Sequence, residues 1–521
     1  MSKKAPRTKR LSVLRLLLSL LVLAGLGYSG LQGTNRIIAY YQTGSDKAWF
    51  APYVDVTATP TFQFQQLGST KQRDAILSFI VSSYNNACTP SWGGSYSISQ
   101  ADNQLDLATR IARLQQQGGS VAISFGGKNN QELAVGCTNP TALYNAYKSV
   151  IDHYHINTVD FDLENAGLSN QAADTRRAAV IAKLQKQMRS NGQKLAVWLT
   201  LPVSPTGLTP EGTSAVSTFL GQGVDLAGVN IMTMDYGSAM TSSQNMLTAS
   251  ESAAIETQRQ LGILYNQAKI HQNSPSLWHK IGLTPMIGQN DFTNEVFTMK
   301  DAEALNSFAL SHNVGRMSMW SANRDITCGS NYVDLSVVSD SCSGVNEGST
   351  NFSSLLSKGF NGSISLSAGF ITKKEAISSS KQIPDNPATS PYQIWSPNGA
   401  YLAGTKVVWH HNVYEAKWWT QGNVPDDPVL QSWQTPWQLI GPVLPGEKPV
   451  PQPTLPAGTY PNWSGTTVYN TGQRVLFNGT PYQAKWWNQG QSPAAASQNP
   501  DSSPWSPLTQ AQIDKIEAAK K

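Results

Sequence analysis

Charged residues are scarce in this 521-residue chain, and its excess of positive charge is concentrated at one end. Asp, Glu, Lys and Arg together make up 14% of the residues, with a formal net charge of +5, whereas a typical soluble domain has roughly 25% charged residues. Residues 1–15 contain six basic residues and no acidic residue, so the rest of the chain is close to neutral. A nucleic-acid partner would require a basic face or stripe, and the composition argues against one.

Cysteine is also rare, and its spacing argues against a metal site. The four cysteines form no CxxC pair, whereas structural metal sites usually show closely paired ligands. An even number of cysteines is typical of disulfides in an exported protein. We expect Cys88–Cys137 and Cys328–Cys342, the simplest of three possible pairings, with four free buried thiols as the alternative.

Long apolar segments are missing, apart from one near the N-terminus. Residues 16–27 (LLLSLLVLAGLG) form a 12-residue apolar run directly after the basic start. This arrangement predicts a secretory signal peptide within residues 1–30, since a membrane-spanning helix needs about 20 apolar residues. We therefore expect a secreted, extracellular protein, and an uncleaved N-terminal membrane anchor is the alternative.

The C-terminal part contains an internal repeat with a constant offset of 68 residues. The segment AKWWTQG at 416–422 returns as AKWWNQG at 484–490, and proline-rich stretches at 381–391 and 441–458 separate compact units. The predicted organisation is: 1–30, signal peptide or anchor; 36–372, catalytic domain; 373–391, linker; 392–440, first module; 441–459, proline-rich linker; 460–508, second module; 509–521, charged tail.

Apolar strands alternate with amphipathic helices through the large N-terminal region. We expect strands at 36–41, 75–83, 120–127, 158–164, 194–203, 226–236, 280–288 and 315–321, with helices such as 106–118, 175–192 and 252–269 between them. Eight strand–helix units predict an α/β fold, a (β/α)8 TIM barrel, followed by two small all-β modules. An open doubly wound sheet is the alternative, but the glycine-rich phosphate loop typical of that fold is missing.

The segment TVDFDLE at 158–164 is the most informative in the chain. Because strand side chains alternate between faces, Asp160, Asp162 and Glu164 point to the same side. Three neighbouring carboxylates repel one another, so at least one must hold a proton or find a partner. Glu164 comes last, at the end of the strand where barrel active sites lie, which suits it to donate a proton to a leaving group, as in glycosidases. A divalent-metal site and a purely structural role are the alternatives.

This segment resembles the DxxDxDxE signature of family 18 glycoside hydrolases, the chitinases. The resemblance covers about 36–372 and extends to SFGG at 124–127, to MTMDY at 232–236 and to Trp320 on the eighth strand. Two positions differ from the family pattern. Asn157 replaces the first Asp of the signature, and Met234 stands where many members have a Tyr, while Tyr236 follows Asp235.

The resemblance implies a role for each residue of the site. The N-acetyl group of the substrate acts as the nucleophile, and Glu164 is the general acid and later the base. Asp162 would stabilise the resulting oxazolinium ion, Asp160 would hold Asp162 and share its proton, and Asp235 would orient the acetamido group. The expected substrate-binding residues of the barrel are Trp320, Tyr236, Met232, Tyr40 and Gln289. Position 315 comes only 27 residues after position 288, which leaves no room for the insertion that deepens the cleft in some relatives. The open cleft that results favours internal cleavage.

The two repeats resemble chitin-binding modules of carbohydrate-binding family 5/12. Such small units cannot bury all their aromatic residues, and because side chains alternate along a strand, one Trp of each adjacent pair should face outward and stack on sugar rings. The expected binding residues are Trp418, Trp419, Trp486 and Trp487. The resemblances together imply a secreted endo-chitinase whose partners are chitin and chito-oligosaccharides, with no cofactor, no metal and no protein partner. The alternatives are an endo-β-N-acetylglucosaminidase that acts on glycans or peptidoglycan, and a non-catalytic chitin-binding lectin on the same barrel.

Overall fold

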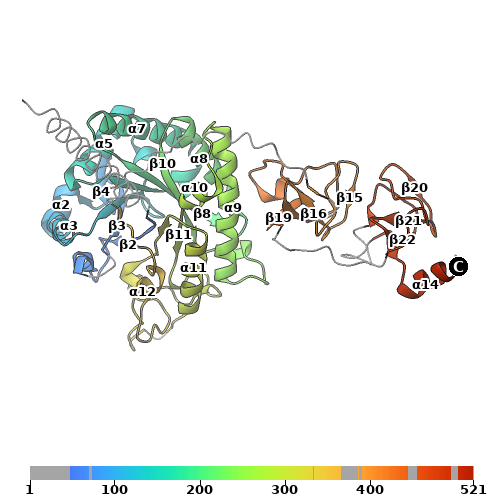
Figure 1. Ribbon diagram of the computed structural model, residues 1–521. Helices are drawn as coiled ribbons and strands as arrows, with labels where there is room; N and C mark the ends of the chain where they lie inside the picture. The colour runs from blue at the N-terminus through green and yellow to red at the C-terminus, as the bar shows by residue number, and fades with distance from the viewer. Residues whose placement is uncertain are drawn as a thin grey trace, which may run out of the picture. The chain divides into compact units, whose positions relative to one another are not determined.

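The computed structural model describes two compact units of the chain, a barrel and a C-terminal region with two small β-modules (Figure 1). The described residues are 47–69, 73–332, 334–364, 385–386, 390–443, 454–493 and 503–519. The predicted signal peptide or anchor, the strand expected at 36–41, Tyr40 and most of both linkers lie outside these residues. No helix within the described residues is both long and apolar enough to span a bilayer.

Eight parallel strand positions close the barrel of the first unit. The strands are β1 (Trp49–Phe50) with β2 (Tyr53–Asp55), β3 (Ala75–Ser83), β6 (Val121–Gly126), β7 (Thr158–Asp162), β8 (Ala196–Ser204), β10 (Leu226–Thr233), β11 (Ile281–Pro285) and β14 (Arg316–Met317). Closure occurs because β1 pairs with β14 while β2 pairs with β3. The predicted TIM barrel is confirmed, and residues 49–55 form its first strand position, which the apolar pattern did not predict.

Helices connect successive strands, as the alternating pattern predicts. They are α2 (Ile98–Gln104), α3 (Leu107–Gln116), α4 (Leu133–Gly136), α5 (Pro140–Tyr154), α6 (Asn165–Ser169), α7 (Gln171–Ser190), α8 (Pro210–Gly221), α9 (Met246–Gln267), α10 (Ser274–His279), α11 (Met299–Ser311) and α12 (Phe352–Leu356). Side-chain caps fix where several of them begin. For example, Asn139 accepts hydrogen bonds from the N–H groups of Thr141 and Ala142 at the start of α5, where Pro140 supplies a helical φ.

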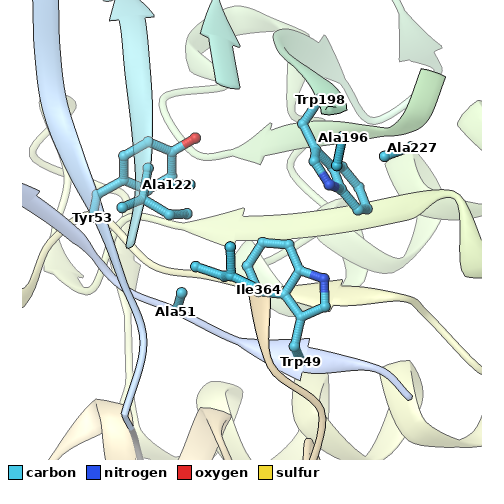
Figure 2. Packing of buried hydrophobic residues seen from close by; sticks show 9 residues of the cluster. Trp49, Ala51, Tyr53, Ala122, Ala196, Trp198, Ala227 and Ile364 are labelled. Atoms are coloured by element: carbon cyan, nitrogen blue, oxygen red, sulfur yellow. The ribbon is translucent and has the colours of Figure 1, made fainter. Parts of the chain in front are cut away.

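Apolar side chains fill the barrel at the end where its strands begin (Figure 2). The cluster consists of Trp49, Ala51, Tyr53, Ile76, Ala122, Ala196, Trp198, Ala227 and Ile364. Ile364 comes from the last described segment of this unit, and its N–H donates to Asp74 at 2.7 Å, just before β3. The chain therefore returns to close the bottom of the barrel, which leaves the opposite end for the loops of the site.

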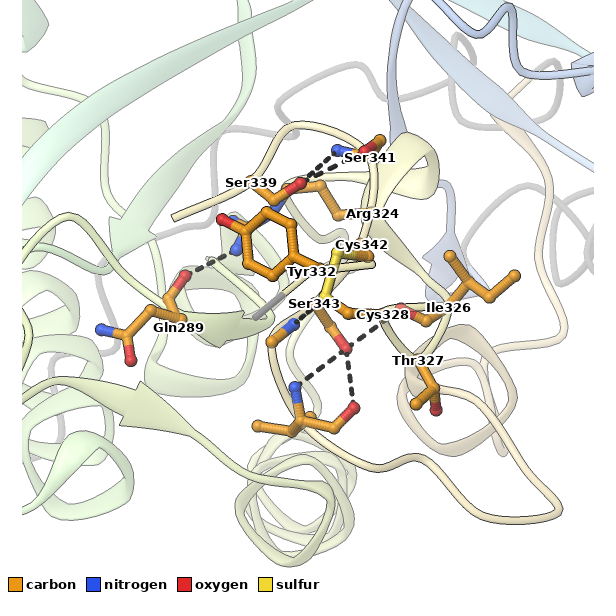
Figure 3. The surroundings of a disulfide bond; sticks show 12 residues. Gln289, Arg324, Ile326, Thr327, Cys328, Tyr332, Ser339, Ser341, Cys342 and Ser343 are labelled. Carbon is orange, nitrogen blue, oxygen red and sulfur yellow. Dashed lines mark hydrogen bonds between the residues drawn. A yellow bond between two sulfur atoms is a disulfide. The ribbon is translucent and has the colours of Figure 1, made fainter. Parts of the chain in front are cut away.

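Two disulfides brace loops at the carboxyl ends of the strands. The predicted pairs Cys88–Cys137 and Cys328–Cys342 are both formed. The second closes the loop after β14, where Arg324 donates to the carbonyl oxygen of Gln289 at 2.5 Å (Figure 3). That bond joins the loop to the short hairpin of β12 (Gly288–Gln289) and β13 (Val296–Phe297), which occupies the space after β11. The remaining loop strands of the barrel are β4 (Asn86–Trp92), β5 (Tyr96–Ser97) and β9 (Gly207–Leu208).

The two C-terminal modules have the same architecture. In the first, β16 (Lys406–Trp409), β17 (Asn412–Ala416) and β19 (Trp437–Pro442) form one sheet, and β15 (Ala400–Tyr401) pairs with β18 (Thr420–Gln421). In the second, the corresponding elements are β21 (Arg474–Phe477), β22 (Thr480–Ala484), β24 (Trp505–Pro507), β20 (Val468–Tyr469) and β23 (Asn488–Gln489). All five strands begin 68 residues after their counterparts, so the sequence repeat is a structural repeat.

The C-terminal segment differs from the charged tail that the sequence suggested. Residues Gln510–Ala518 form helix α14, which begins with a capping box at Thr509. Its Ile513 is buried in a cluster with Leu455, Leu476 and Leu508 of the second module. Leu455 comes from the predicted proline-rich linker, so that module recruits residues from both of its flanks.

Candidate active site

A cleft of about 440 Å³ opens at the carboxyl ends of the barrel strands. Its lining includes Asp162, Glu164, Met232, Asp235 and Trp320, which the sequence had marked as catalytic or substrate-binding residues. The remaining lining residues are Tyr53, Asp55, Thr57, Phe79, Gly93, Lys128, Asn129, Asn130, Thr200, Met234, Thr284, Met286, Asp291, Val338 and Asp340. Residues separated by more than 150 positions in the sequence therefore meet in one space.

Strand β7 brings the carboxylates to this cleft because its neighbours hold it closely on both sides. Asp162 lies opposite Gly126 of β6 and Thr200 of β8. Gly126 has a φ of 107°, and a Cβ atom there would lie 2.1 Å from the carbonyl oxygen of Asp162. Only glycine fits such a close approach, which explains one glycine of the SFGG segment in physical terms.

Asp160 lies beneath the cleft and is fully enclosed by hydrogen-bond donors. Its Oδ2 accepts from Tyr53 Oη at 2.9 Å and from Ser124 Oγ at 2.7 Å. Its Oδ1 accepts from Thr200 Oγ1 and from Arg316 Nη1, both at 2.7 Å. Four donors, one of them a guanidinium, favour the ionised carboxylate. Asp160 is therefore a buried anion that four other strands of the barrel hold in place.

Asp162 and Glu164 are in a different electrostatic situation. Burial first, and then the nearby charges of Glu164 and Asp160, hold the pKa of Asp162 well above its usual range, although Arg316 opposes this effect. Burial also raises the pKa of Glu164 to about 7, with Lys128 acting to lower it and Asp235 and Asp291 to raise it. Both groups therefore hold protons at a pH where an exposed carboxyl group would have lost its own.

The expected sharing of a proton between Asp160 and Asp162 stays a prediction. Within the described residues, Asp162 Oδ1 is buried without a hydrogen-bond partner, and both oxygens of Asp160 are occupied by other donors. Burying a polar atom without a partner costs free energy. A substrate group that enters the cleft can therefore supply the hydrogen bond that Asp162 Oδ1 lacks within the described residues.

Asp235 faces Glu164 from the end of β10. Its backbone has a φ of 49°, and its Oδ1 accepts from the N–H of Asp291 at 2.8 Å. Burial raises the pKa of the Asp235 carboxyl group, and this hydrogen bond partly offsets the effect. Glu295 fixes the turn after Asp235 by accepting from the N–H groups of Tyr236 and Gly237, at 2.9 and 2.6 Å.

Trp320 offers an aromatic surface at the base of the cleft. Its ring stacks on Phe79, with centroids 5.5 Å apart and planes inclined by 20°. Tyr53 lies against it at 6.1 Å. Trp320 is only half-buried and lines the cleft, so it can take a sugar ring against its uncovered surface.

Two residues expected to bind substrate do not line the cleft. Tyr236 is buried and its hydroxyl group donates to Ser250 Oγ at 3.2 Å, whereas Met234 lines the cleft instead. Gln289 is buried in the hairpin after β11, where its Nε2 donates to backbone carbonyls, among them that of Phe292 at 3.0 Å. Both residues support loops of the site, and strand alternation gives no guide beyond Thr233, where β10 ends.

Sequence reasoning missed Tyr53, Thr200, Arg316, Lys128 and Asp291. Lone polar residues at the ends of apolar strands gave little sign of their role, because only the closed barrel brings them together. Arg316, alone of these, could have been suspected: a basic residue at the start of a buried strand needs an anionic partner. Within the described residues, no group of three or more His, Cys, Asp or Glu side chains is arranged to hold a metal ion.

The tryptophan pairs of the modules are exposed in both copies. Trp418 and Trp419 are 44% and 51% exposed, and Trp486 and Trp487 are 43% and 60% exposed. Strand alternation predicted one exposed member in each pair, whereas both members are exposed in each module. Lys417 Nζ lies 4.9 Å from the ring centre of Trp418, and Lys485 repeats this contact at 4.6 Å from that of Trp486.

Comparisons with known proteins agree with these features. Residues 462–506 match the model of carbohydrate-binding module family 5/12. The chain is 36% identical over 298 residues to a probable bifunctional chitinase/lysozyme of Escherichia coli, which covers 55% of this chain and 32% of that protein. It is 35% identical over 289 residues to Endochitinase 11 of Metarhizium anisopliae, with 54% of each chain covered. The chain thus spans at most about half the length of these curated relatives.

Solved structures extend the likeness to the fold. The catalytic domain of a hyperthermophilic chitinase from Pyrococcus furiosus superposes with a TM-score of 0.51 at 28% identity, covering 62% of this chain and 97% of that domain. The predicted relationship of the barrel to chitinases is confirmed by these comparisons. The family 5/12 assignment is confirmed for the second module, and the first module shares its strand arrangement and its core.

Proposed function

We propose that this protein, whose barrel is related to chitinase catalytic domains, is a glycoside hydrolase that cleaves β-1,4-linked N-acetylglucosamine polymers. The observation that carries the proposal is the convergence of Asp162, Glu164 and Asp235 above Trp320 in one cleft. An aromatic floor suits a sugar ring, and a protonated carboxyl group beside it suits the cleavage of a glycosidic bond.

Glu164 is the general acid in this proposal. Its pKa of about 7 keeps it protonated below neutral pH, so it can protonate the glycosidic oxygen. Once the leaving group has departed, the same carboxylate can accept a proton from the attacking water. A group whose pKa lies near the working pH can perform both steps.

The nucleophile is the acetamido oxygen of the substrate itself. Asp160 is saturated by its four donors and lies below the cleft, and Asp162 holds a proton, so neither is a free nucleophile. Asp162 Oδ1, which has no partner within the described residues, can accept a hydrogen bond from the acetamido N–H, which orients the acetamido oxygen and stabilises the positive charge that develops on this group. This mechanism retains the anomeric configuration, as in the substrate-assisted families.

Secretion, internal cleavage and binding to solid chitin complete the proposal. Two disulfides suit an oxidising compartment. The connection after β11 forms only the short hairpin of β12 and β13, which favours binding of the middle of a polysaccharide chain. The exposed tryptophans of the two modules can stack on a flat polysaccharide surface, and the two linked contacts raise the local concentration of enzyme.

Product analysis on chito-oligosaccharides of defined length tests the proposal. The full chain should release shorter oligomers whose new reducing ends are initially β, and Glu164→Gln should release none. Exposed Glu303 on α11 supplies the matched control, because Glu303→Gln should leave turnover unchanged. Peptidoglycan is included because one relative is described as a probable chitinase/lysozyme; hydrolysis of peptidoglycan alone would refute the proposed substrate.

A further inference from the structure

An ion pair spans the mouth of the barrel. Lys128 follows β6, the third strand position, and Asp291 follows β11, the seventh. In a barrel of eight strands these positions lie on opposite sides of the axis. Even so, Lys128 Nζ lies 2.6 Å from Asp291 Oδ2, and both residues line the cleft. The two side chains therefore meet over the opening that a polysaccharide must use.

Both ends of this bridge are connected to the acidic groups of the site. Asn165, the residue after Glu164, donates from Nδ2 to the carbonyl oxygen of Lys128 at 3.1 Å. The N–H of Asp291 donates to Asp235 Oδ1 at 2.8 Å. Lys128 is thus held to the loop that carries Glu164, and Asp291 is held to the loop that carries Asp235.

We propose that Lys128 and Asp291 are positioning residues for the reaction, a cation and an anion held over the cleft that adjust the general acid Glu164 in opposite directions. This inference rests on the proposed function. Lys128 stabilises the ionised form of Glu164, whereas Asp291 disfavours it, and the pKa of Glu164 responds accordingly to each. The bridge keeps both charges beside the acid, so their balance decides how readily Glu164 gives up its proton.

Substitutions at Lys128 and Asp291 remove none of the other charged groups around Glu164. Those facing the cleft are Asp55, Asp162, Asp235 and Asp340, with Arg324 interacting with Asp235, Asp291 and Asp340, and with Asp160 and Arg316 buried below. The side chain of Lys128 is 64% exposed and that of Asp291 is 37% exposed. Exposed ion pairs contribute little to stability, so the bridge can open for a substrate and can be removed without unfolding the barrel.

The pH dependence of kcat/KM on a soluble chito-oligosaccharide tests the proposal with Lys128→Met, Asp291→Asn and the double variant. Lys128→Met should move the alkaline limb of the profile up by about 0.5–1 pH unit, and Asp291→Asn should move it down by a similar amount. The double variant should return close to the wild-type limb. High salt should reduce both shifts, because both side chains are exposed.

Shifts of opposite sign in the two single variants distinguish an electrostatic effect on Glu164 from a purely structural role of the bridge. Both single variants break the same ion pair, so a bridge that only holds two loops together would change both profiles alike. A shift of the same sign in both variants, or no shift in either, overturns the proposal. Lys148→Met, which removes the exposed Lys148–Asp152 pair of α5, is the matched control and should leave the profile unchanged.

A titration that does not use activity separates this inference from the proposed function. Carbon NMR of the Glu164 carboxyl group in the full chain, assigned with Glu164→Gln, follows its ionisation directly. Opposite shifts in this titration, with no hydrolysis by the wild type, would refute the chitinase proposal and support the bridge. Hydrolysis by the wild type with unshifted titrations would refute the bridge alone.

Discussion

Replacing Arg316 tests whether its buried contact with Asp160 maintains the site. The guanidinium is 1% exposed and donates to Asp160 Oδ1 at 2.7 Å, to Tyr53 Oη at 2.8 Å and to Ser318 Oγ at 3.0 Å. Arg316→Met keeps most of the apolar stem but leaves Asp160 as a buried anion without a counter-charge. Breaking a buried pair in this way costs about 3–5 kcal/mol.

Differential scanning calorimetry of the full chain measures this loss. At about 2.1 cal/mol/K of unfolding entropy per residue, 1 kcal/mol corresponds to roughly 1.5 °C for a barrel of about 320 residues, so its transition should fall by roughly 4–8 °C. The transitions of the two modules should not move, since they have separate cores. This internal reference shows that the change is confined to the barrel.

A double variant identifies the unpaired charge as the cause. Asp160→Asn, combined with Arg316→Met, removes the carboxylate that Arg316→Met alone leaves buried without a counter-charge. The double variant should be less destabilised than the sum of the two single variants, because the two residues act as a pair. A barrel transition that Arg316→Met leaves unchanged, or losses that simply add, would refute the reasoning.

The remaining predictions concern the acid, the disulfides and the modules. Turnover should fall as the pH rises through about 7, because Glu164 then loses its proton, and Glu164→Gln should lower turnover by roughly 10²–10⁴-fold or more at every pH. The raised pKa of Glu164 also means that the native barrel loses stability between about pH 4.5 and 7, so Glu164→Gln should be more stable than the wild type at pH 8 but equal to it near pH 4, by urea unfolding. Thiol titration of the denatured, unreduced protein should find no free cysteine, and two or more titratable thiols would contradict the pairing. Deleting 381–521 should spare turnover of soluble oligomers but lower the release of sugar from crystalline chitin; equal rates on the solid would contradict a binding role. Part of that loss should follow alanine substitution of the exposed residues Trp418, Trp419, Trp486 and Trp487.

Sequence reasoning worked best where one local pattern sufficed. Strand β3 was predicted with the bounds that it has, and the constant offset of the repeat correctly indicated two copies of one compact unit. The TVDFDLE segment located the cleft, since its three carboxylates follow from strand alternation alone. The pairing of four cysteines was also accessible, because the simplest connectivity joins neighbouring loops of a barrel.

Prediction failed where the signal depended on contacts distant in the sequence. The run at 36–41 is more apolar than residues 49–55, yet Trp49, Tyr53 and their neighbours form the first strand because they complete the barrel core. Tyr53, from this strand position, lines the cleft, whereas the predicted Tyr40 lies outside the described residues. The C-terminal helix α14 was missed because charged residues alternate with Ile513 and Ile516, whose apolar partners lie in the second module.

The order of the three carboxyl groups along one strand has a physical consequence. Arg316 and three hydroxyl groups keep the innermost group, Asp160, ionised inside the barrel. Burial raises the pKa of the next group, Asp162, and the nearby charges of Glu164 and Asp160 raise it further. Glu164, outermost, is less buried and has Lys128 beside it, so its pKa reaches only about 7. The proton available for chemistry is therefore the one at the mouth of the barrel, on the Glu164 carboxyl group, where the charge of Lys128 partly offsets the effect of burial.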